Sequence, residues 1–335
     1  MKTRSKGIAL ISVLLVVVVG TVLAVRMITT QSLSASHAGT QSINMQAREY
    51  ALGGEELARQ ILGEDMRNAE SASRDHLGEP WADPNLSFKF ENGEVSLQII
   101  DLQGLINLNA VTERENSRTS RWLRTYIAEL QVDSAFQDRI VDWVDSDNVT
   151  RGLGAEEYDY LALARPFRPA DGPITDISEL RLLLDMTPEV FELLNGGLTA
   201  LPINFAFINV NTAPASVLQS LSPGLTLAQA ESMVLARDAE GGYTSIASFL
   251  SQPELAGLGV VPAGLGVQSR YFRVQVRARY LDRYAYLSSV IERNPTLGVM
   301  QVIYRDHSRK FFPVLHDDKL DGDQDTLPQT EAGDA

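Results

Sequence analysis

The chain has 335 residues, enough for two or three domains, and its formal net charge is −14 at pH 7. Such acidity argues against a nucleic-acid partner, because contacts to phosphates need Lys and Arg side chains. The sequence contains no cysteine, so disulfide bonds are excluded, although that absence fits either redox compartment.

The first predicted element is an apolar segment near the N-terminus. Residues 7–25 carry no charged side chain and consist mostly of Ile, Leu, Val and Ala. As a helix this segment spans roughly 28 Å, about the hydrocarbon thickness of a bilayer. A secretory signal peptide has a shorter apolar core and a small-residue cleavage site, which does not directly follow this run. The segment therefore predicts a retained transmembrane helix, with a cleaved signal peptide or a buried soluble helix as the alternatives.

Basic residues on one side of this segment predict its orientation. Lys2, Arg4 and Lys6 precede the apolar run, and basic flanks stay on the cytoplasmic side of a membrane. We therefore expect a single-pass protein of the inner membrane with a cytoplasmic N-terminus. Everything after residue 26 then lies in the periplasm of a Gram-negative cell.

Helical periodicity continues past the transmembrane segment to about residue 63. Apolar side chains recur there at spacings of three, four and seven residues. Two adjacent glycines, Gly53 and Gly54, are a candidate kink. The apolar stripe consists of Ile43, Ala47, Tyr50, Leu57 and Ile61.

A β-hairpin is the next predicted element. The pair Asn92-Gly93 lies between two runs that alternate apolar and polar residues, which is the sequence signal of a tight hairpin turn. Its second run places Val95, Leu97 and Ile99 on one face.

The pattern turns helical from about residue 112 to residue 250 and then returns to strands. One helix has Thr187 as its predicted N-cap, Pro188 at the first helical position and Gly196 as its C-cap. A helical block between strand segments predicts an α+β fold, in which an all-α insertion interrupts an antiparallel sheet. Separate consecutive domains are the alternative. The later strands are expected at residues 270–281, 284–293 and 299–306.

The N-terminus resembles the signal of type IV prepilins. In that signal a short basic leader ends in a glycine, here Gly7, and the apolar run begins at the next residue, here Ile8. The resemblance implies that prepilin peptidase cleaves after Gly7 on the cytoplasmic side and methylates the new amino group of Ile8. The apolar helix stays attached, and a long helix followed by a sheet is the layout of pilin-like proteins.

Ser12 stands where most pilins carry a glutamate, at the fifth mature position if Ile8 is the first. A charged side chain at mid-bilayer costs about 2.5–3.5 kcal/mol, so it is kept where it finds a partner. In pilin assembly that glutamate is thought to neutralise the terminal amine of the subunit above. A subunit with nothing above it needs no such glutamate, so Ser12 predicts a tip position. The alternative interpretation is that Ser12 is an ordinary residue of a generic membrane anchor.

Longer motifs resemble the family of general secretion pathway protein K, the largest minor pseudopilin of type II secretion systems. The resemblance extends from about residue 4 to residue 305. It implies a non-enzymatic protein that nucleates and caps a periplasmic pseudopilus. The implied partners are the minor pseudopilins I and J, and H, through the N-terminal helix and the pilin-like domain. The motifs are YALGGEELA, DLQGLINLNA, DWVDSDN, GAEEYDYL, ITDISELRLLLDMTPEVFELL and INVNTAPASVLQSL.

The periodicity and the resemblance together predict a domain organisation. It comprises a long helical anchor packed on an antiparallel sheet and a large all-α insertion. The last twenty residues carry seven acids and one Lys, a composition typical of a solvated tail. The expected parts are a leader (1–7), a transmembrane segment (8–28), a pilin-like α/β domain (64–110 and 266–312), an all-α insertion (111–202), a helix-hairpin-helix-like module (203–265) and an acidic tail (313–335).

Residues 203–265 resemble a helix-hairpin-helix module, with Thr212 as the expected cap of its first helix. In DNA-binding versions the hairpin reads Gly-apolar-Gly, but Thr226 occupies the second glycine position here. Up to residue 250 the module has three acids against Arg237 alone, which disfavours a polyanion. We therefore expect a structural or protein-docking module and no nucleic-acid partner. A membrane-anchored, competence-type DNA receptor is the alternative.

An acidic stretch, DWVDSDNVTRGLGAEEYDY, is the candidate metal site. Acids this dense repel one another unless they are solvated or share a cation. Oxygen ligands on a glycine-containing loop suit Ca²⁺, and no Cys or His lies nearby for zinc. The spacing of Asp145, Asp147 and Glu156 matches positions 1, 3 and 12 of an EF-hand loop, but Val149 and Thr150 at positions 5 and 6 exclude that motif.

The residues alone leave a metal site and a solvated loop open, and the family resemblance implies calcium in the helical domain. The candidate ligands are Asp142, Asp145, Asp147, Glu156, Glu157 and Asp159, with Asp171 and Asp176 as distal candidates.

No catalytic pattern accompanies these motifs. The four histidines are scattered and form neither a Ser/His/Asp triad nor a metalloprotease motif, and the sequence has no glycine-rich phosphate loop. We therefore expect no enzyme activity. The histidines are His37, His76, His307 and His316.

Overall fold

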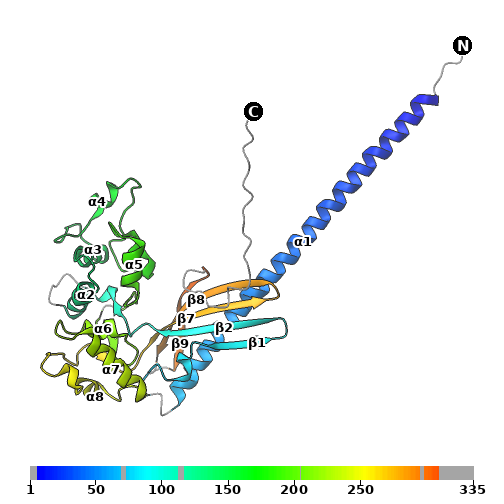
Figure 1. The fold of residues 1–335 in the computed structure, drawn as a ribbon. Coiled ribbons are helices and arrows are strands. Elements are labelled where there is room, and N and C mark those ends of the chain that lie inside the picture. Colours follow the sequence, from blue (N-terminus) through cyan, green and yellow to red (C-terminus); the bar gives the residue numbers. More distant parts are fainter. Residues whose placement is uncertain (1–5, 69–72, 112–116, 204, 295–297, 309–335) are drawn as a thin grey trace.

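The computed structural model describes residues 6–68, 73–111, 117–203, 205–294 and 298–308 (Figure 1). Its first element, α1 (Lys6–Arg67), is one helix of 62 residues. The N-terminal part of α1 is long and apolar enough to cross a membrane, and its side chains are exposed from residue 10 to residue 39. The helix runs through Gly53 and Gly54 without interruption, so the candidate kink is not formed.

The second half of α1 packs on a five-stranded antiparallel sheet. The strand order is β1-β2-β7-β8-β9, so the sheet combines strands from before and after the helical segments. The predicted hairpin is confirmed, because β1 and β2 pair antiparallel across Asn92-Gly93. The strands are β1 (Leu86–Phe90), β2 (Gly93–Asp101), β7 (Tyr271–Tyr280), β8 (Arg283–Asn294) and β9 (Val299–Asp306).

Small residues allow α1 to lie close against the sheet. Ala51 and Ala58 of the helix are almost fully buried, and they share a core with inward-facing residues of β2, β7 and β8. Gly54 makes the closest approach, since a Cβ there would lie 2.5 Å from Cγ1 of Val276 and 2.8 Å from Cγ1 of Val95. A larger residue at this position therefore collides with the middle of the sheet.

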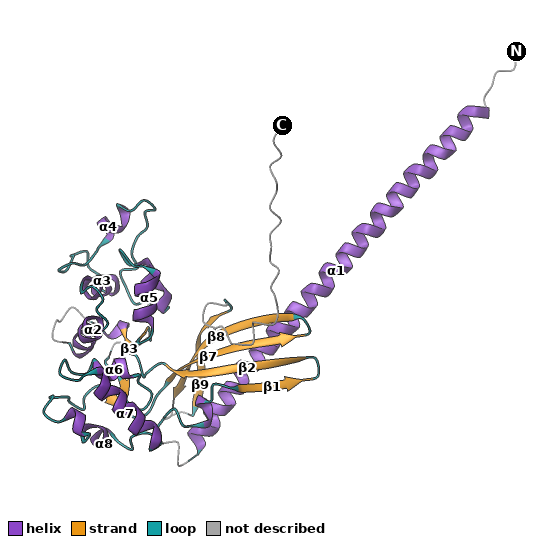
Figure 2. Ribbon diagram, in the orientation of Figure 1, coloured by secondary structure: helices purple, strands orange, loops and turns teal. Residues whose placement is uncertain are grey.

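Residues 102–270, which we call the helical insertion, connect β2 to β7. Figure 2 shows its helices gathered at the end of the sheet that is remote from the N-terminus of α1. Two parallel two-stranded pairs, β3 with β4 and β5 with β6, tie the insertion together. Its α-helices are α2 (Arg118–Glu129), α3 (Ala135–Val144), α4 (Glu157–Leu161), α5 (Pro188–Asn195), α6 (Ala215–Gln219), α7 (Leu227–Ala239) and α8 (Ile246–Leu250). Its short strands are β3 (Ile106–Asn107), β4 (Leu198–Thr199), β5 (Ile208–Asn209) and β6 (Leu265–Gly266). Its 3₁₀ turns are η2 (Leu108–Ala110), η3 (Ile177–Leu182) and η4 (Pro253–Leu255). A further 3₁₀ turn, η1 (Pro80–Ala82), precedes the sheet.

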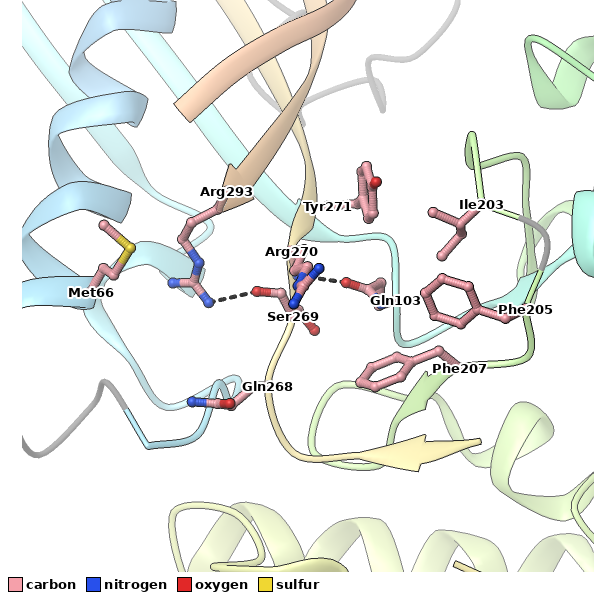
Figure 3. A pocket seen from close by; sticks show the side chains of 10 residues that line it. All are labelled: Met66, Gln103, Ile203, Phe205, Phe207, Gln268, Ser269, Arg270, Tyr271 and Arg293. Carbon is pink, nitrogen blue, oxygen red and sulfur yellow. Dashed lines mark hydrogen bonds between the residues drawn. The ribbon is translucent and has the colours of Figure 1, made fainter. Parts of the chain in front are cut away.

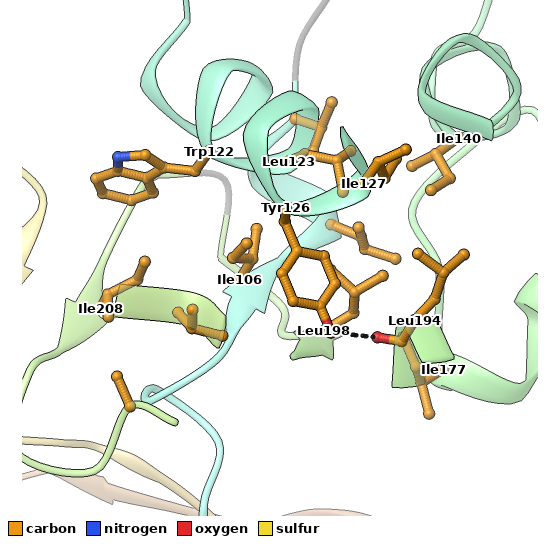
Figure 4. Packing of buried hydrophobic residues seen from close by; sticks show 14 of the residues in the cluster. Ile106, Trp122, Leu123, Tyr126, Ile127, Ile140, Ile177, Leu194, Leu198 and Ile208 are labelled. Atoms are coloured by element: carbon orange, nitrogen blue, oxygen red, sulfur yellow. Dashed lines mark hydrogen bonds between the residues drawn. The ribbon is translucent and has the colours of Figure 1, made fainter. Parts of the chain in front are cut away.

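The insertion has a hydrophobic core of its own, distinct from the core under the sheet. Tyr126 of α2 lies in it beside Leu198 and Leu194 (Figure 4). Its hydroxyl donates to the carbonyl oxygen of Leu194 at 3.2 Å, so the buried polar atom is satisfied. Each fully buried Leu or Ile contributes about 1.5–3 kcal/mol, so this region is a folded unit rather than a long loop.

The structure confirms one predicted helix cap and contradicts another. The Thr187 cap is confirmed, because its hydroxyl accepts from the backbone N–H of Val190 and Pro188 begins α5. The Thr212 cap is wrong. α6 begins at Ala215, and the Thr212 hydroxyl donates to Asp101 Oδ2 at 2.6 Å instead. The buried carboxyl group of Asp101 accepts from Asn209 and Ser269 as well, so the Thr212 hydroxyl is part of a buried network rather than a helix cap.

Candidate metal centre

The acidic stretch folds into one cluster between the end of α3 and the start of α4. Asp145 is the C-cap of α3 and Glu156 is the N-cap of α4. Carboxylate oxygens of Asp145, Asp147 and Glu156 lie within 4.8 Å of one another. Asp145 also adds negative charge to the C-terminal end of α3, which is the negative end of the helix dipole. The negative charge of Asp145 therefore does not stabilise the end of α3, and helix capping does not explain why these carboxylates lie together.

Several carboxylate oxygens in this region are buried without a hydrogen-bond donor. Within the described residues, these atoms are Oδ1 of Asp142, Oδ1 of Asp145, both Oε atoms of Glu156 and Oδ1 of Asp171. A buried polar atom left unpaired costs about 1–3 kcal/mol, and more when it is charged. Neighbouring acids with several unsatisfied oxygens form a donor set of the kind that suits a hard cation.

Burial and repulsion between neighbouring carboxylates raise the pKa values of three acids in this region, Asp142, Asp145 and Glu156. The pKa of Glu156 rises to about 7, because burial disfavours its charged form and because Asp142, Asp145, Asp171 and Asp147 repel it. The pKa of Asp142 rises to about 6, mainly through burial. Burial also raises the pKa of Asp145. A bound cation would oppose these shifts, because a nearby positive charge favours the ionised forms of the carboxyl groups.

Arg151 supplies part of the missing positive charge. Its Nε lies 3.1 Å from Asp145 Oδ2 and its Nη2 lies 3.3 Å from Asp147 Oδ2. Its backbone N–H donates to Asp142 Oδ2 at 3.2 Å. A Cβ on Gly154 would overlap Asp142 Oδ2, so this glycine allows the loop to approach the buried acid. Arg151 was not among the residues singled out from the sequence, and its place between the acids in DSDNVTRG was the available signal.

Two predicted ligands lie outside the cluster. Glu157 pairs with Arg168 at 3.0 Å on the surface, and Asp159 accepts from the backbone N–H of Glu156 at 3.0 Å. Of the distal candidates, Asp171 lies close enough to Glu156 to raise its pKa. Asp176 instead caps η3 by accepting from the N–H of Ser178. The structure therefore brings together Asp142, Asp145, Asp147, Glu156 and Asp171, which we call the acidic cluster.

A second buried polar network, which sequence analysis missed, joins α1, the sheet and the insertion. Arg293 of β8 binds Asp65 of α1 at 2.8 Å and also pairs with Asp75. Burial is the largest effect on the acids of this network. It raises the pKa of Asp75 to about 6 and that of Glu79 to about 7. Arg293 lies more than 200 residues after Asp65 and Asp75 in the sequence, so only the fold brings it to these acids.

A cavity of about 320 Å³ lies next to this network. Figure 3 shows Met66 and Arg293 on one side of it and Ile203, Phe205 and Phe207 of the insertion on the other. Arg293 donates to the carbonyl oxygen of Ser269 at 2.8 Å. The cavity therefore marks the junction between the sheet and the insertion.

The residues proposed for processing and tip placement lie in the first turns of α1. Gly7, Ile8 and Ser12 all belong to this helix, and the Ser12 side chain is exposed. The leader residues 1–5 lie outside the described part of the chain, as does the acidic tail from residue 309.

The segment predicted as a helix-hairpin-helix-like module, residues 203–265, uses Arg237 internally. Arg237 of α7 is 2 % exposed and donates to the backbone carbonyl oxygens of Val210 and Ala213. Thr226 caps α7 through the N–H of Gln229. The arginine counted in this module therefore does not reach the surface, where a phosphate would bind.

A long apolar helix packed on an antiparallel sheet, with a helical insertion between two central strands, defines a pilin-like protein with an N-terminal membrane anchor. Two family models described as "Type II secretion system (T2SS), protein K" match residues 104–203 and 208–268. Together with the relatives described below, these matches show that the chain belongs to the type II secretion system protein K family. It is therefore a minor pseudopilin.

Curated relatives match almost the whole chain. Type II secretion system protein K of Pseudomonas aeruginosa is 34 % identical over 328 residues, covering 94 % of this chain and 96 % of the relative. The protein of the same name from Klebsiella pneumoniae is 33 % identical over 329 residues, covering 91 % and 98 %. A solved structure of the GspK-GspI-GspJ complex from the enterotoxigenic Escherichia coli type 2 secretion system contains a chain that matches with a TM-score of 0.72 and 27 % identity. That match covers 81 % of this chain and 99 % of the solved chain.

Proposed function

We propose that this minor pseudopilin occupies the tip of a periplasmic pseudopilus, where it nucleates assembly and caps the filament for export of proteins across the outer membrane. The observation that carries the proposal is the position of the helical insertion, which lies at the end of the sheet remote from the apolar start of α1 (Figure 1). A subunit stacked on that end would meet the insertion rather than the pilin-like sheet. Ser12 fits the same position, because a terminal subunit has no amine above it to neutralise.

The proposed partners are the minor pseudopilins I and J, with H. The solved relative comes from a complex of GspK with GspI and GspJ, and α1 of this chain exposes a long apolar surface from residue 10 onward. Apolar helices packed side by side remove such surface from water or lipid and bring the pilin-like domains of these proteins together. This role is structural and requires no catalysis.

A labelling experiment in cells tests the tip position. Pseudopili would be assembled with this chain carrying an epitope in the exposed loop of the insertion near Val149, and decorated with gold-labelled antibody. Label at one end of each filament is the expected result. Label along the filament length, or filaments of normal number in cells lacking this chain, would contradict a role in capping and nucleation.

We also propose the membrane topology and maturation that the sequence implies. The chain crosses the inner membrane once, with residues 1–7 in the cytoplasm and the sheet and insertion in the periplasm. Prepilin peptidase removes the leader after Gly7 and methylates Ile8. Support comes from the basic residues before the apolar run and from the long apolar helix, the one candidate span within the described residues.

The acidic cluster is proposed to hold a structural Ca²⁺. Asp145, Asp147 and Glu156 would be the central ligands, with Asp142 and Asp171 close by. The donor set supports this assignment, because it consists of carboxylate oxygens, several of them unsatisfied, which suits a hard cation. Bound calcium would supply positive charge that holds the end of α3 and the start of α4 together.

The segment from α6 to α8 is proposed to be a helix-hairpin-helix-like module with a structural or protein-docking role. The burial of Arg237 supports this role over DNA binding.

A further inference from the structure

A groove of about 410 Å³ lies on the insertion, between α2 and the hairpin that joins α6 to α7. Arg118, Arg121 and Arg124 of α2 line one side, and Pro223 of the hairpin and Val260 of the loop after η4 line the other. The three arginines are spaced by three residues, so they share one face of the helix. We call this feature the arginine groove.

The three arginines lack anionic partners among the described residues. None of them forms an ion pair within that part of the chain, and Arg124 donates instead to the neutral side chain of Gln137 at 3.3 Å. The Nε of Arg118 is buried and has no hydrogen-bond acceptor there. Elsewhere in the same acidic chain, buried or half-buried arginines such as Arg151 and Arg293 do bind carboxylates. Within the described residues, the groove therefore concentrates positive charge that no carboxylate pairs with.

The position of these arginines on α2 strengthens the positive potential. Arg118 is the first residue of α2, Arg121 lies one turn further on, and the first turn contains no acid. The N-terminal end of a helix already carries a partial positive charge and normally attracts acidic side chains. Arginines placed there are mutually unfavourable unless an anion lies near them. The arrangement costs stability in the isolated insertion and favours an anionic ligand.

The lining of the groove fits a polypeptide better than a bare anion. The indole of Trp122, with Pro223 and Val260, provides apolar surface beside the guanidinium groups. The chain itself contains a segment of matching chemistry. Residues 313–335 carry seven carboxylates and one Lys, interspersed with Leu320 and Leu327. The groove lining and this segment therefore both combine charged and apolar groups, with charges of opposite sign.

We propose that the arginine groove binds the acidic C-terminal segment, residues 313–335, of the same chain. The described part ends at Ser308 after β9, and the 27 residues beyond it can extend to roughly 90 Å. A tethered segment of this kind reaches an effective concentration in the millimolar range. Exposed ion pairs contribute at most about 1 kcal/mol each, so the segment docks reversibly and is released by salt. Docking covers the hairpin that would otherwise be exposed on the insertion.

A zero-length cross-link tests this proposal in the full-length chain in detergent micelles. Arg121→Lys keeps the positive charge and adds an amine that a water-soluble carbodiimide joins to carboxylates in direct contact. We expect cross-links within a single chain to acids between Asp317 and Asp334, identified by mass spectrometry of the monomer band. The yield should fall at least tenfold in 0.5 M NaCl, because salt screens exposed charges.

Arg283→Lys is the matched control, since Arg283 of β8 is also exposed but lies outside the groove. It should give at least tenfold fewer cross-links to residues 313–335. Equal yields from the two variants would overturn the proposal. So would cross-links from the groove only to Glu113 or Glu115, which precede α2, or links to the tail found only between two chains.

Discussion

Arg151 Nε lies 3.1 Å from Asp145 Oδ2, so a guanidinium group occupies one side of the acidic cluster. The same side chain reaches Asp147. The proposed calcium ion would bind these two carboxylates as well. The cluster therefore has an internal cation that offsets part of its charge before any metal arrives.

Calcium should raise the unfolding temperature of the full-length chain in detergent by several degrees relative to chelator. A ligand bound only by the folded state adds about 2.7 kcal/mol at a hundredfold excess over Kd. Asp145→Asn combined with Asp147→Asn should abolish this increase, as followed by thermal unfolding. Glu157→Gln is the control, because Glu157 pairs with Arg168 and lies outside the acidic cluster. An unchanged calcium response in the double variant would rule out these ligands.

Arg151→Met should have opposite effects with and without calcium. Without calcium it leaves Asp145 and Asp147 without their ion pairs and should destabilise the fold by about 1 kcal/mol, a modest value because the arginine is partly exposed. With calcium it removes a competing cation, so calorimetry should show affinity raised roughly tenfold. Weaker calcium binding in this variant would show that Arg151 supports the site rather than competing with the ion.

Stability without calcium should fall as pH rises from about 4.5 to 7. The folded-state pKa of Glu156 is about 7, above its ordinary value of 4.5. In this window the folded chain therefore holds a proton that the unfolded chain has released, and raising the pH removes that stabilisation. Glu156→Gln should flatten the dependence in urea unfolding measured at several pH values. A residual slope is expected, because Glu79, Asp75 and Asp142 also have raised pKa values.

Calcium affinity should change with pH in the opposite direction. Binding needs ionised carboxylates, so affinity should rise between pH 6 and pH 8 and protons should be released on binding. Titrations in buffers of different ionisation enthalpy measure that release directly. Binding without proton release would contradict the raised pKa of Glu156.

Gly54→Ala should destabilise the packing of α1 on the sheet by about 1–3 kcal/mol, the usual cost of overpacking. The added methyl group would lie 2.5 Å from Val276 and 2.8 Å from Val95. Gly53→Ala is a control from the adjacent position, where a Cβ meets nothing within 4 Å. It should stabilise the helix by about 0.5–1 kcal/mol. Equal effects in denaturant unfolding would disprove the close contact at Gly54.

Gly7→Glu should block maturation, because prepilin peptidase requires a small residue before the scissile bond. The uncleaved chain would remain about seven residues heavier by intact mass, and Ile8 would not be methylated. Ala at the same position is the control and should allow partial cleavage. Mature protein with a methylated Ile8 in the Gly7→Glu variant would refute the assignment of the cleavage site.

Local patterns in the sequence predicted those parts of the fold that depend on local interactions. The long apolar helix, the Asn92-Gly93 hairpin and the Thr187 cap each rest on neighbouring residues, and each is present. The mixed helical and antiparallel architecture followed from the order of such segments. The Thr212 cap failed because that hydroxyl binds a distant residue, Asp101, and α6 begins only at Ala215.

In the candidate site, too, residues that are neighbours in the sequence were predicted, and residues that only the fold brings together were not. Asp145, Asp147 and Glu156 were found because they lie close together in the sequence, and they meet in space. Their spacing alone did not exclude Glu157, which the turn of α4 directs toward Arg168. The network of Arg293 with Asp65 and Asp75 joins residues from three separate segments. Patterns within a sequence window do not detect such a network.

The pairing of β2 with β7 also affects how the chain folds. Asp101 pairs with Phe272, and the N–H of Leu102 donates to the carbonyl oxygen of Tyr271 at 3.0 Å, so the two ends of the helical insertion are held side by side. Contacts of such high contact order form slowly, because a long loop must close first. If the insertion folds early, its two ends meet and the effective loop becomes short. Substitutions that loosen the insertion core should therefore delay formation of the sheet, even though they lie outside it.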